Sequence, residues 1–345
     1  KLLTYSHTTL KNVPPGLTRS PGTDPFQSEA PASSTSLSDV GDSVVNHSEL
    51  VGNSSGNLLL HRTANVTEEE TTANATTLEL CPLIPPKLVG RRKVLGSLRI
   101  DKLEKLFPHL MPGGRYKPKE CIARHRVAIV IPYRDREEHL RALLHNMHYM
   151  LRKQQLDYGM FVIEEAGQEI FNRAMLRNIG YLEASALYDY QCFIFHDVDL
   201  IPEDDRNLYT CPEHPRHMSV AIDIYRYRLP YLGIFGGVTA LKKEHMQLVN
   251  GFSNKFWGWG GEDDDMSHRL RHACNLSITR YPVNISRYIM LKHKKDTPNP
   301  DRLKIMNNGT LRYKTDGINS VKYKRLDIVF KKLYTWILVD VKPKD

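Results

Sequence analysis

The chain has 345 residues and a formal net charge of +9. The positive charge forms no basic stripe interleaved with aromatic residues, and the most concentrated charged motif is acidic, so we exclude nucleic-acid binding. No apolar run approaches the roughly 18 residues of a membrane-spanning helix, so we expect neither such a helix nor a signal peptide in it.

Residues 1–80 have the composition of a disordered stem. They contain only two aromatic residues and are rich in Ser, Thr, Asn, Pro and Gly, so their ordering would bury too little apolar surface to offset the entropy lost. Four Asn-x-Ser/Thr sequons, which indicate a glycosylated segment of the secretory pathway, begin at Asn46, Asn53, Asn65 and Asn74. We therefore predict a glycosylated stem over 1–80 and a catalytic domain over 81–345.

Alternating strand and helix patterns follow this boundary. Residues 127–133 are an apolar run that ends at a proline and charged residues, as a buried strand does. A helical pattern over 137–154 comes next, then a strand over 160–163, a helix over 171–188 and a strand over 192–195. This order predicts an α/β fold whose mostly parallel sheet is flanked by helices and binds ligands at the carboxyl ends of its strands.

Asp197 and Asp199 come directly after the third predicted strand. Carboxylates at such a strand end suit a Mn²⁺ or Mg²⁺ ion carried by a diphosphate, although a lone Asp-x-Asp is commonly a solvated turn. Met290 and His293 offer a thioether and an imidazole three residues apart, but on their own the residues favour an ordinary surface His beside lysines.

Two further polar segments invite a functional reading. Arg134 and Arg136 follow the first strand, where guanidinium groups could meet phosphates or form an ordinary surface pair. Residues 291–311 are a long polar connection with two prolines, and we expect a lid without regular structure there.

The run Phe-Trp-Gly-Trp-Gly-Gly-Glu-Asp-Asp-Asp over 256–265 combines two indoles, three glycines and four carboxylates. A fold has little use for four adjacent like charges, since they repel one another and resist burial. A site that grips a sugar and removes a proton from it can use them all, although the residues do not tell which carboxylate is the base. The alternatives are a solvated turn and a carbohydrate-binding module without catalysis.

These motifs together carry a resemblance. From about 81 to 341 the chain resembles the animal β-1,4-galactosyltransferases through VAIVIPYRDREEHL, QQLDYGMFVIEEAG, IFNRAMLRNIGY, CFIFHDVDLIP, FGGVTAL, FWGWGGEDDD and MLKH. The resemblance implies an inverting, Mn²⁺-dependent enzyme of the GT-A fold that uses a UDP-sugar donor and a GlcNAc-terminated acceptor. It also implies a type II membrane protein of the Golgi lumen whose anchor lies outside this chain.

The resemblance implies roles for individual residues as well. The base is Asp263, and the metal ligands are Asp199, Met290 and His293. Donor-binding residues are Pro132, Arg134, Arg136, Phe171, Arg173, Asp197, Val198 and Trp259. Acceptor-binding residues are Tyr231, Gly261, Glu262, Asp264, Arg302 and Leu303. Disulfides pair Cys81 with Cys121 and Cys192 with Cys211, which leaves Cys274 free.

Three positions and the length of one connection depart from the family's vertebrate pattern. Ile224 replaces a Lys, Leu303 replaces a Phe, and the connection after Met290 is about three residues shorter. Ile234 stands where vertebrate members have Tyr facing the C2 substituent of the donor sugar, and an Ile leaves room for an acetamido group. In this respect the chain most resembles the family's invertebrate β-1,4-N-acetylgalactosaminyltransferase members. We therefore expect UDP-GalNAc as the donor and GalNAcβ1,4GlcNAc as the product; the alternative is a galactosyltransferase that uses UDP-Gal.

Overall fold

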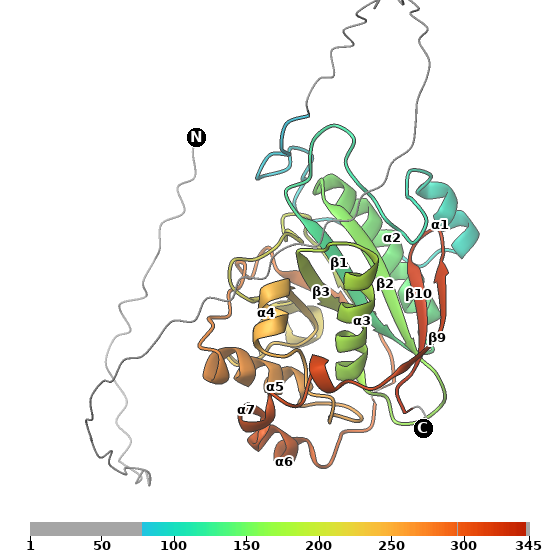
Figure 1. The fold of residues 1–345 in the computed structure, drawn as a ribbon. Coiled ribbons are helices and arrows are strands. Elements are labelled where there is room, and N and C mark those ends of the chain that lie inside the picture. The colour runs from blue at the N-terminus through green and yellow to red at the C-terminus, as the bar shows by residue number, and fades with distance from the viewer. Residues whose placement is uncertain (1–77, 295, 343–345) are drawn as a thin grey trace, which may run out of the picture. The chain divides into compact units, whose positions relative to one another are not determined.

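The computed structural model describes residues 78–294 and 296–342, so the predicted stem lies outside the described residues except for 78–80. A seven-stranded sheet runs in the order β5-β7-β3-β1-β2-β10-β9 (Figure 1). Strands β3, β1, β2 and β10 are parallel, and β9, β7 and β5 are antiparallel to their neighbours. The strands are β1 (Arg126–Tyr133), β2 (Asp157–Glu165), β3 (Cys192–His196), β5 (Arg216–His217), β7 (Val238–Lys242), β9 (Lys324–Phe330) and β10 (Thr335–Asp340).

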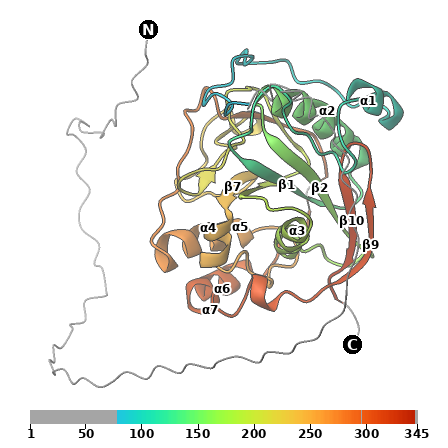
Figure 2. The ribbon, with the colours of Figure 1, turned by 45° about the horizontal axis from the view of Figure 1, so that its top comes forward.

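Two long helices cover opposite faces of this sheet, as Figure 2 shows. They are α2 (Glu137–Lys153) and α3 (Arg173–Leu187). Side chains of β1 alternate between the two faces: Val127 and Ile129 pack in the core on the α2 side, whereas Ala128 and Val130 pack on the α3 side. A strand buried on both faces needs a continuous apolar sequence, which explains the run that starts at Val127.

The predicted α/β fold with its mostly parallel sheet is confirmed, and each predicted strand and helix up to β3 is present. The remaining helices are short: α1 (Ile100–Leu106), α4 (Lys243–Leu248), α5 (Glu262–His268), α6 (Arg302–Asn307) and α7 (Gly309–Arg312), with single turns at Asp223–Tyr225 and Ile318–Ser320 and a π-helix at Arg269–Ala273. None of the helices in the described part of the chain is long and apolar enough to cross a membrane.

A second sheet of three short strands lies beyond the end of β3. Its order is β4-β8-β6, from Leu200–Pro202, Arg287–Met290 and Ala221–Ile222. Two disulfides, Cys81–Cys121 and Cys192–Cys211, are the pairs that the resemblance implies, and Cys274 is free. The second disulfide ties the start of β3 to the segment that leads into the small sheet.

Candidate active site

The turn between β3 and β4 brings distant parts of the chain together. The Leu200 N–H donates to the Asp197 carbonyl at 3.3 Å, which closes a turn around Asp199. In the small sheet Leu200 lies opposite Met290, and the Leu291 N–H donates to the Asp199 carbonyl at 2.8 Å. Strand pairing therefore places Met290 beside the Asp-x-Asp turn, although 90 residues separate them in the sequence.

His293 completes this group, with Nε2 2.8 Å from Asp199 Oδ2. Burial and the neighbouring Asp197 raise the pKa of Asp199, and His293 opposes that shift. A carboxylate oxygen, an imidazole nitrogen and the nearby Met290 thioether form a mixed donor set that fits Mn²⁺ better than Mg²⁺. The described residues contain no cluster of three or more His, Cys, Asp or Glu suited to a metal.

Two arginines on α3 hold the first carboxylate of the turn. Arg173 Nη1 donates to Asp197 Oδ2 at 2.7 Å, and its Nε donates to Glu262 Oε1 at 2.8 Å. Arg177 Nη2 donates to Asp197 Oδ1 at 3.0 Å, and its side chain is only 1% exposed. Sequence reasoning missed Arg177; its one signal is its place four residues after Arg173, on the same helix face.

The four adjacent carboxylates form the first turn of α5 and then divide in role. Asp265 is fully buried and accepts from Arg269 Nε at 2.7 Å and from Arg312 Nη2 at 3.2 Å. The interpretation that a fold has little use for all four was therefore wrong, because two arginines make the buried Asp265 part of the core. The three glycines of the run have the expected left-handed φ, namely 86° at Gly258, 97° at Gly260 and 95° at Gly261.

Asp263 and Asp264 face a different set of partners. The Tyr231 hydroxyl donates to Asp264 Oδ1 at 2.9 Å. Asp263 lies so close to Gly236 that a Cβ at that glycine would overlap its Oδ2. Burial, followed by the Glu262 carboxylate, raises the pKa of Asp263 to about 7 against the opposing charge of Arg173. A carboxylate that titrates near neutrality is suited to accept a proton from a hydroxyl.

A cavity of about 240 Å³ lies beside this carboxylate network. It is lined by four residues that the sequence predicted for donor binding and four that it did not: Arg134, Phe171, Arg173 and Trp259, with Ile170, Gly258, Asp296 and Thr297. The Arg134 guanidinium lies 5.0 Å from the centre of the Phe171 ring. Arg136 lies 3.8 Å from Asp296 at the rim.

Only one of the two indoles is open. Trp259 is 52% exposed at the cavity, whereas Trp257 packs against the core with the Lys342 ammonium 4.3 Å from the centre of its ring. Pro132 is buried within β1, and Val198 is buried in the turn after β3. These two therefore contribute backbone and shape rather than an open side chain.

The connection over 291–311 is not structureless, contrary to expectation, because it contains α6 and the start of α7. Its residues 297–299 pair with the loop over 256–261, here called the Trp loop. The Trp259 N–H donates to the Thr297 carbonyl at 3.1 Å, and the Asn299 N–H donates to the Trp259 carbonyl at 2.9 Å. Arg302 packs on Gly260 and Gly261, where a Cβ would lie 3.3 Å and 3.1 Å from its side-chain atoms. Contact with the Trp loop and α5 thus gives this polar segment regular structure.

Ile234 and Leu303 lie outside the lining of this cavity. Ile234 is partly exposed in the turn that leads from Tyr231 to Gly236, and its carbonyl accepts from Arg280 Nη2 at 2.9 Å. The turn borders α5, because Ser267 Oγ donates to the Gly233 carbonyl at 2.6 Å. Leu303 is 59% exposed on α6.

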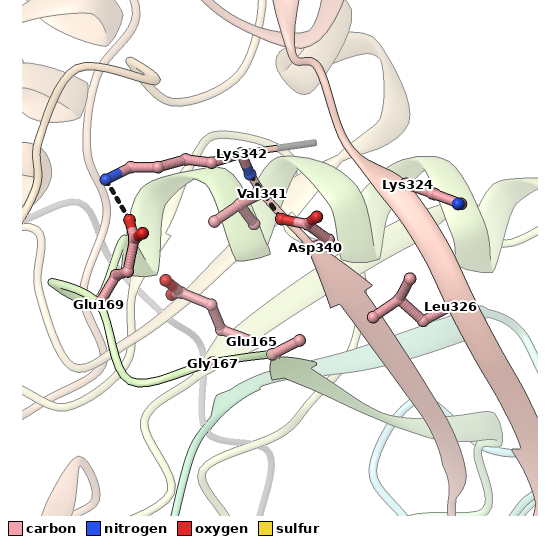
Figure 3. Close-up of a pocket in the computed structure, with 9 residues that line it drawn as sticks. Glu165, Gly167, Glu169, Lys324, Leu326, Asp340, Val341 and Lys342 are labelled. Carbon is pink, nitrogen blue, oxygen red and sulfur yellow. Dashed lines mark hydrogen bonds and ion pairs between the residues drawn. The ribbon is translucent and has the colours of Figure 1, made fainter. Parts of the chain in front are cut away.

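A second cavity of about 480 Å³ adjoins the ends of β2 and β10 (Figure 3). Glu165 and Asp340 line it together with an ion pair between Lys342 and Glu169. Arg134 links the two cavities, since its Nη1 donates to the Glu169 carbonyl at 2.8 Å. No motif in the sequence predicted this cavity.

Comparison with known proteins shows that this chain is similar to sugar-transferring enzymes. Residues 81–212 match the N-terminal region of glycosyl transferase group 7, and residues 216–294 match a model described as the N-terminal domain of galactosyltransferase. The chain is 48% identical to beta-1,4-galactosyltransferase 1 of Mus musculus over 79% of its length and 69% of that protein. The corresponding Homo sapiens protein is 46% identical over 77% of the chain and 68% of its own length.

Solved structures agree in fold. The catalytic domain of Drosophila beta1,4galactosyltransferase 7 with xylobiose has a TM-score of 0.55 and 29% identity, over 64% of this chain and 95% of that one. A mutant of that enzyme, in complex with manganese, UDP-Gal and xylobiose, has a TM-score of 0.55 and 28% identity over the same shares.

Proposed function

The chain belongs to the β-1,4-galactosyltransferase family, and from this premise we propose that it transfers GalNAc from UDP-GalNAc to the 4-hydroxyl of a terminal β-GlcNAc. The enzyme class, a glycosyltransferase of the GT-A fold, follows from the family itself. The proposed reaction is Mn²⁺-dependent and inverts the anomeric centre. The observation that carries the proposal is the contact of Asp263 with Gly236. Because Gly236 follows Ile234 by two residues in the sequence, this contact brings the candidate base close to the residue on which the choice of donor rests.

Asp199, Met290 and His293 are the residues that would hold Mn²⁺. When bound, the metal would neutralise the charge that develops on the departing UDP. Arg134 and Arg173, which line the smaller cavity, would bind phosphate oxygens through their guanidinium groups. The exposed face of Trp259 offers a stacking surface to a sugar ring in the same cavity.

Asp263 would take the proton of the acceptor 4-hydroxyl, since its raised pKa lets it accept a proton near neutral pH. Glu262 and Asp264 would orient the acceptor. Support for this role comes from Glu262 Oε2, which is buried and has no hydrogen-bond partner among the described residues. A sugar hydroxyl would satisfy that oxygen, while Glu262 Oε1 stays with Arg173.

The choice of donor rests on Ile234. An aliphatic side chain leaves room for the acetamido group at C2 and gives its methyl an apolar neighbour. Such a difference is worth roughly 1–3 kcal/mol, or about 10–200-fold in specificity. The second candidate is transfer of galactose, which is supported by the names of the relatives and by the neighbour complexed with UDP-Gal.

A comparison of kcat/KM for UDP-GalNAc and UDP-Gal on a GlcNAc acceptor tests the donor choice. We expect UDP-GalNAc to be preferred and Ile234→Tyr to shift the ratio toward UDP-Gal. The matched control is Ile100→Tyr, an exposed position at the start of α1 that should leave the ratio nearly unchanged. A tenfold preference of the unmodified enzyme for UDP-Gal would establish the second candidate.

The location of the native protein is also a proposal. Four sequons within residues 46–74 and two disulfides fit an oxidising, glycosylating compartment. We place the enzyme in the Golgi lumen as a type II membrane protein, with residues 1–80 as its stem and 81–345 as its catalytic domain.

A further inference from the structure

A chain of buried polar side chains lies directly beneath the Asp197–Asp199 turn. It runs from Asn207 through Tyr288 and Tyr209 to His196, and none of these four side chains is exposed to solvent. The linking distances are 3.1 Å from Asn207 Nδ2 to the Tyr288 hydroxyl, 3.0 Å between the two hydroxyls, and 3.0 Å from the Tyr209 hydroxyl to His196 Nε2. His196 Nδ1 then lies 2.9 Å from the Asp197 carbonyl oxygen.

The chemistry of the two ends fixes the direction of every hydrogen bond in this chain. A carbonyl can only accept, so His196 Nδ1 carries a hydrogen and donates it to the Asp197 oxygen. At the other end the Asn207 amide donates to the Met218 carbonyl and to the Tyr288 oxygen. Tyr288 must then donate to Tyr209, and Tyr209 to the lone pair of His196 Nε2.

Only a neutral His196 satisfies this order. If the ring were charged, Nε2 would donate to Tyr209, and the Tyr288 hydrogen would lose its acceptor within the chain. Burial lowers the pKa of His196 to about 4, which agrees with a neutral ring. The chain therefore requires the Nδ1–H tautomer of His196.

The network joins the two segments that supply the candidate metal ligands. Tyr288 belongs to β8, which ends at Met290, and the Asp197 carbonyl also accepts from Leu200 in the turn that carries Asp199. Tyr209 is fixed independently, because its N–H donates to Gln154 Oε1 at 2.9 Å and the Cys192–Cys211 disulfide closes two residues later. Outer groups that fix a ligand's orientation typically control metal affinity.

We propose that His196, Tyr209 and Tyr288 are positioning residues that set the Asp197 carbonyl and thereby align Asp199 with Met290 for the metal. This inference rests on the proposed metal-dependent function and deepens it. The three side chains touch neither substrate nor metal. They act by holding the backbone of the turn against the strand that ends at Met290.

A second buried pair in the same molecule provides a matched control. His148 and Tyr158 are also fully buried, with Nδ1 2.8 Å from the Tyr158 hydroxyl, but His148 Nε2 lies 2.9 Å from the Leu333 carbonyl. The same reasoning gives His148 the Nε2–H tautomer, the opposite of His196. Its hydroxyl partner lies on β2, outside the candidate metal site.

The test measures tautomers and metal affinity without a sugar donor. Long-range ¹⁵N NMR of histidine-labelled protein, with signals assigned by His196→Asn and His148→Asn, should show a protonated Nδ1 at His196 and a protonated Nε2 at His148.

The second measurement is the affinity for Mn²⁺, determined by electron paramagnetic resonance in the presence of UDP. Tyr209→Phe should weaken Mn²⁺ binding by about tenfold. Tyr158→Phe removes the same kind of hydroxyl and should lower the melting temperature to a similar degree, with Mn²⁺ affinity within about twofold of the unmodified protein.

The outcomes separate this proposal from the proposed function. Normal Mn²⁺ binding by the unmodified protein, together with equal affinities of Tyr209→Phe and Tyr158→Phe, would overturn the positioning role alone. An Nε2–H tautomer at His196 would do the same. Failure of the unmodified protein to bind Mn²⁺ would overturn both the metal-dependent function and the role of the network within it.

Discussion

Asp265 and Arg269 form an ion pair in which neither side chain is exposed, with 2.7 Å between Oδ2 and Nε. Breaking a buried pair leaves an uncompensated charge, so Asp265→Ala should destabilise the protein by about 3–5 kcal/mol in urea unfolding. Asp264→Ala, one residue earlier in the same acidic run, should change the free energy of unfolding by less than about 1 kcal/mol. Equal losses from the two variants would contradict the division of roles within α5.

Asp263→Asn should lower kcat by roughly 10²–10⁴ while UDP binding survives, because the amide keeps the shape of the side chain but cannot take the proton. Steady-state kinetics together with calorimetric titration of UDP measure both quantities. An active Asp263→Asn beside an inactive Asp264→Asn would mean that the roles of the two carboxylates are reversed.

The pH dependence of kcat/KM follows from the same residue. A base must be unprotonated to act, so activity should rise with pH through about 7, where the Asp263 pKa lies in the folded protein. Acceptor kcat/KM measured from pH 5 to 9 at saturating donor checks this. A kcat/KM that stays constant from pH 5 to 9 would contradict a base with a pKa near 7.

We also expect the ionised form of Asp263 to lower the stability of the folded protein. Its folded pKa of about 7 exceeds the ordinary value of 3.8, so its ionisation is disfavoured in the fold and stability is lost as pH rises between these values. Asp263→Asn should therefore raise the melting temperature at pH 8 and not at pH 4. Asp316→Asn should instead lower it at pH 8. Burial raises the pKa of Asp316, but the hydrogen bonds from Ser253, from the Asn254 N–H and from Arg312 together outweigh burial and hold that pKa below its usual range.

The metal prediction concerns the chemistry of the ligands. Asp199→Asn should abolish turnover, and Met290→His should loosen the preference for Mn²⁺ over Mg²⁺, since a thioether is a poor partner for a hard ion. Activity measured with each metal after treatment with EDTA provides the comparison. Full activity in EDTA alone would contradict metal dependence.

The central elements could be predicted from the sequence because their signals are local. The apolar run through Val130 and the helical pattern around Leu144 mark a strand and a helix without knowledge of any partner. The small sheet could not be predicted this way, since β4 and β8 are only three and four residues long and lie far apart in the chain. Met290 and His293 were therefore implied as metal ligands only by the family resemblance, whereas Asp199 was already indicated by its place after a strand.

Burial by distant residues accounts for most of what the sequence did not reveal. Trp257 and Trp259 are equivalent in the motif, but Lys342, near the end of the chain, lies over the first and leaves the second open. Arg177 sits in an ordinary helical position, and its importance depends on Asp197, which belongs to another element. Such roles follow from tertiary contacts that no local pattern encodes.

The backbone pairing of Trp259 with residues 297–299 couples the motion of these two segments. Two main-chain hydrogen bonds join the backbone of Trp259 to that segment, so a shift of either segment that keeps both bonds moves the other with it. Trp259 is the open indole among the three tryptophans, since Trp257 is packed and Trp336 donates to Glu164. A change in tryptophan fluorescence that is lost in Trp259→Phe would therefore report a shift of residues 297–299 without a label on the protein.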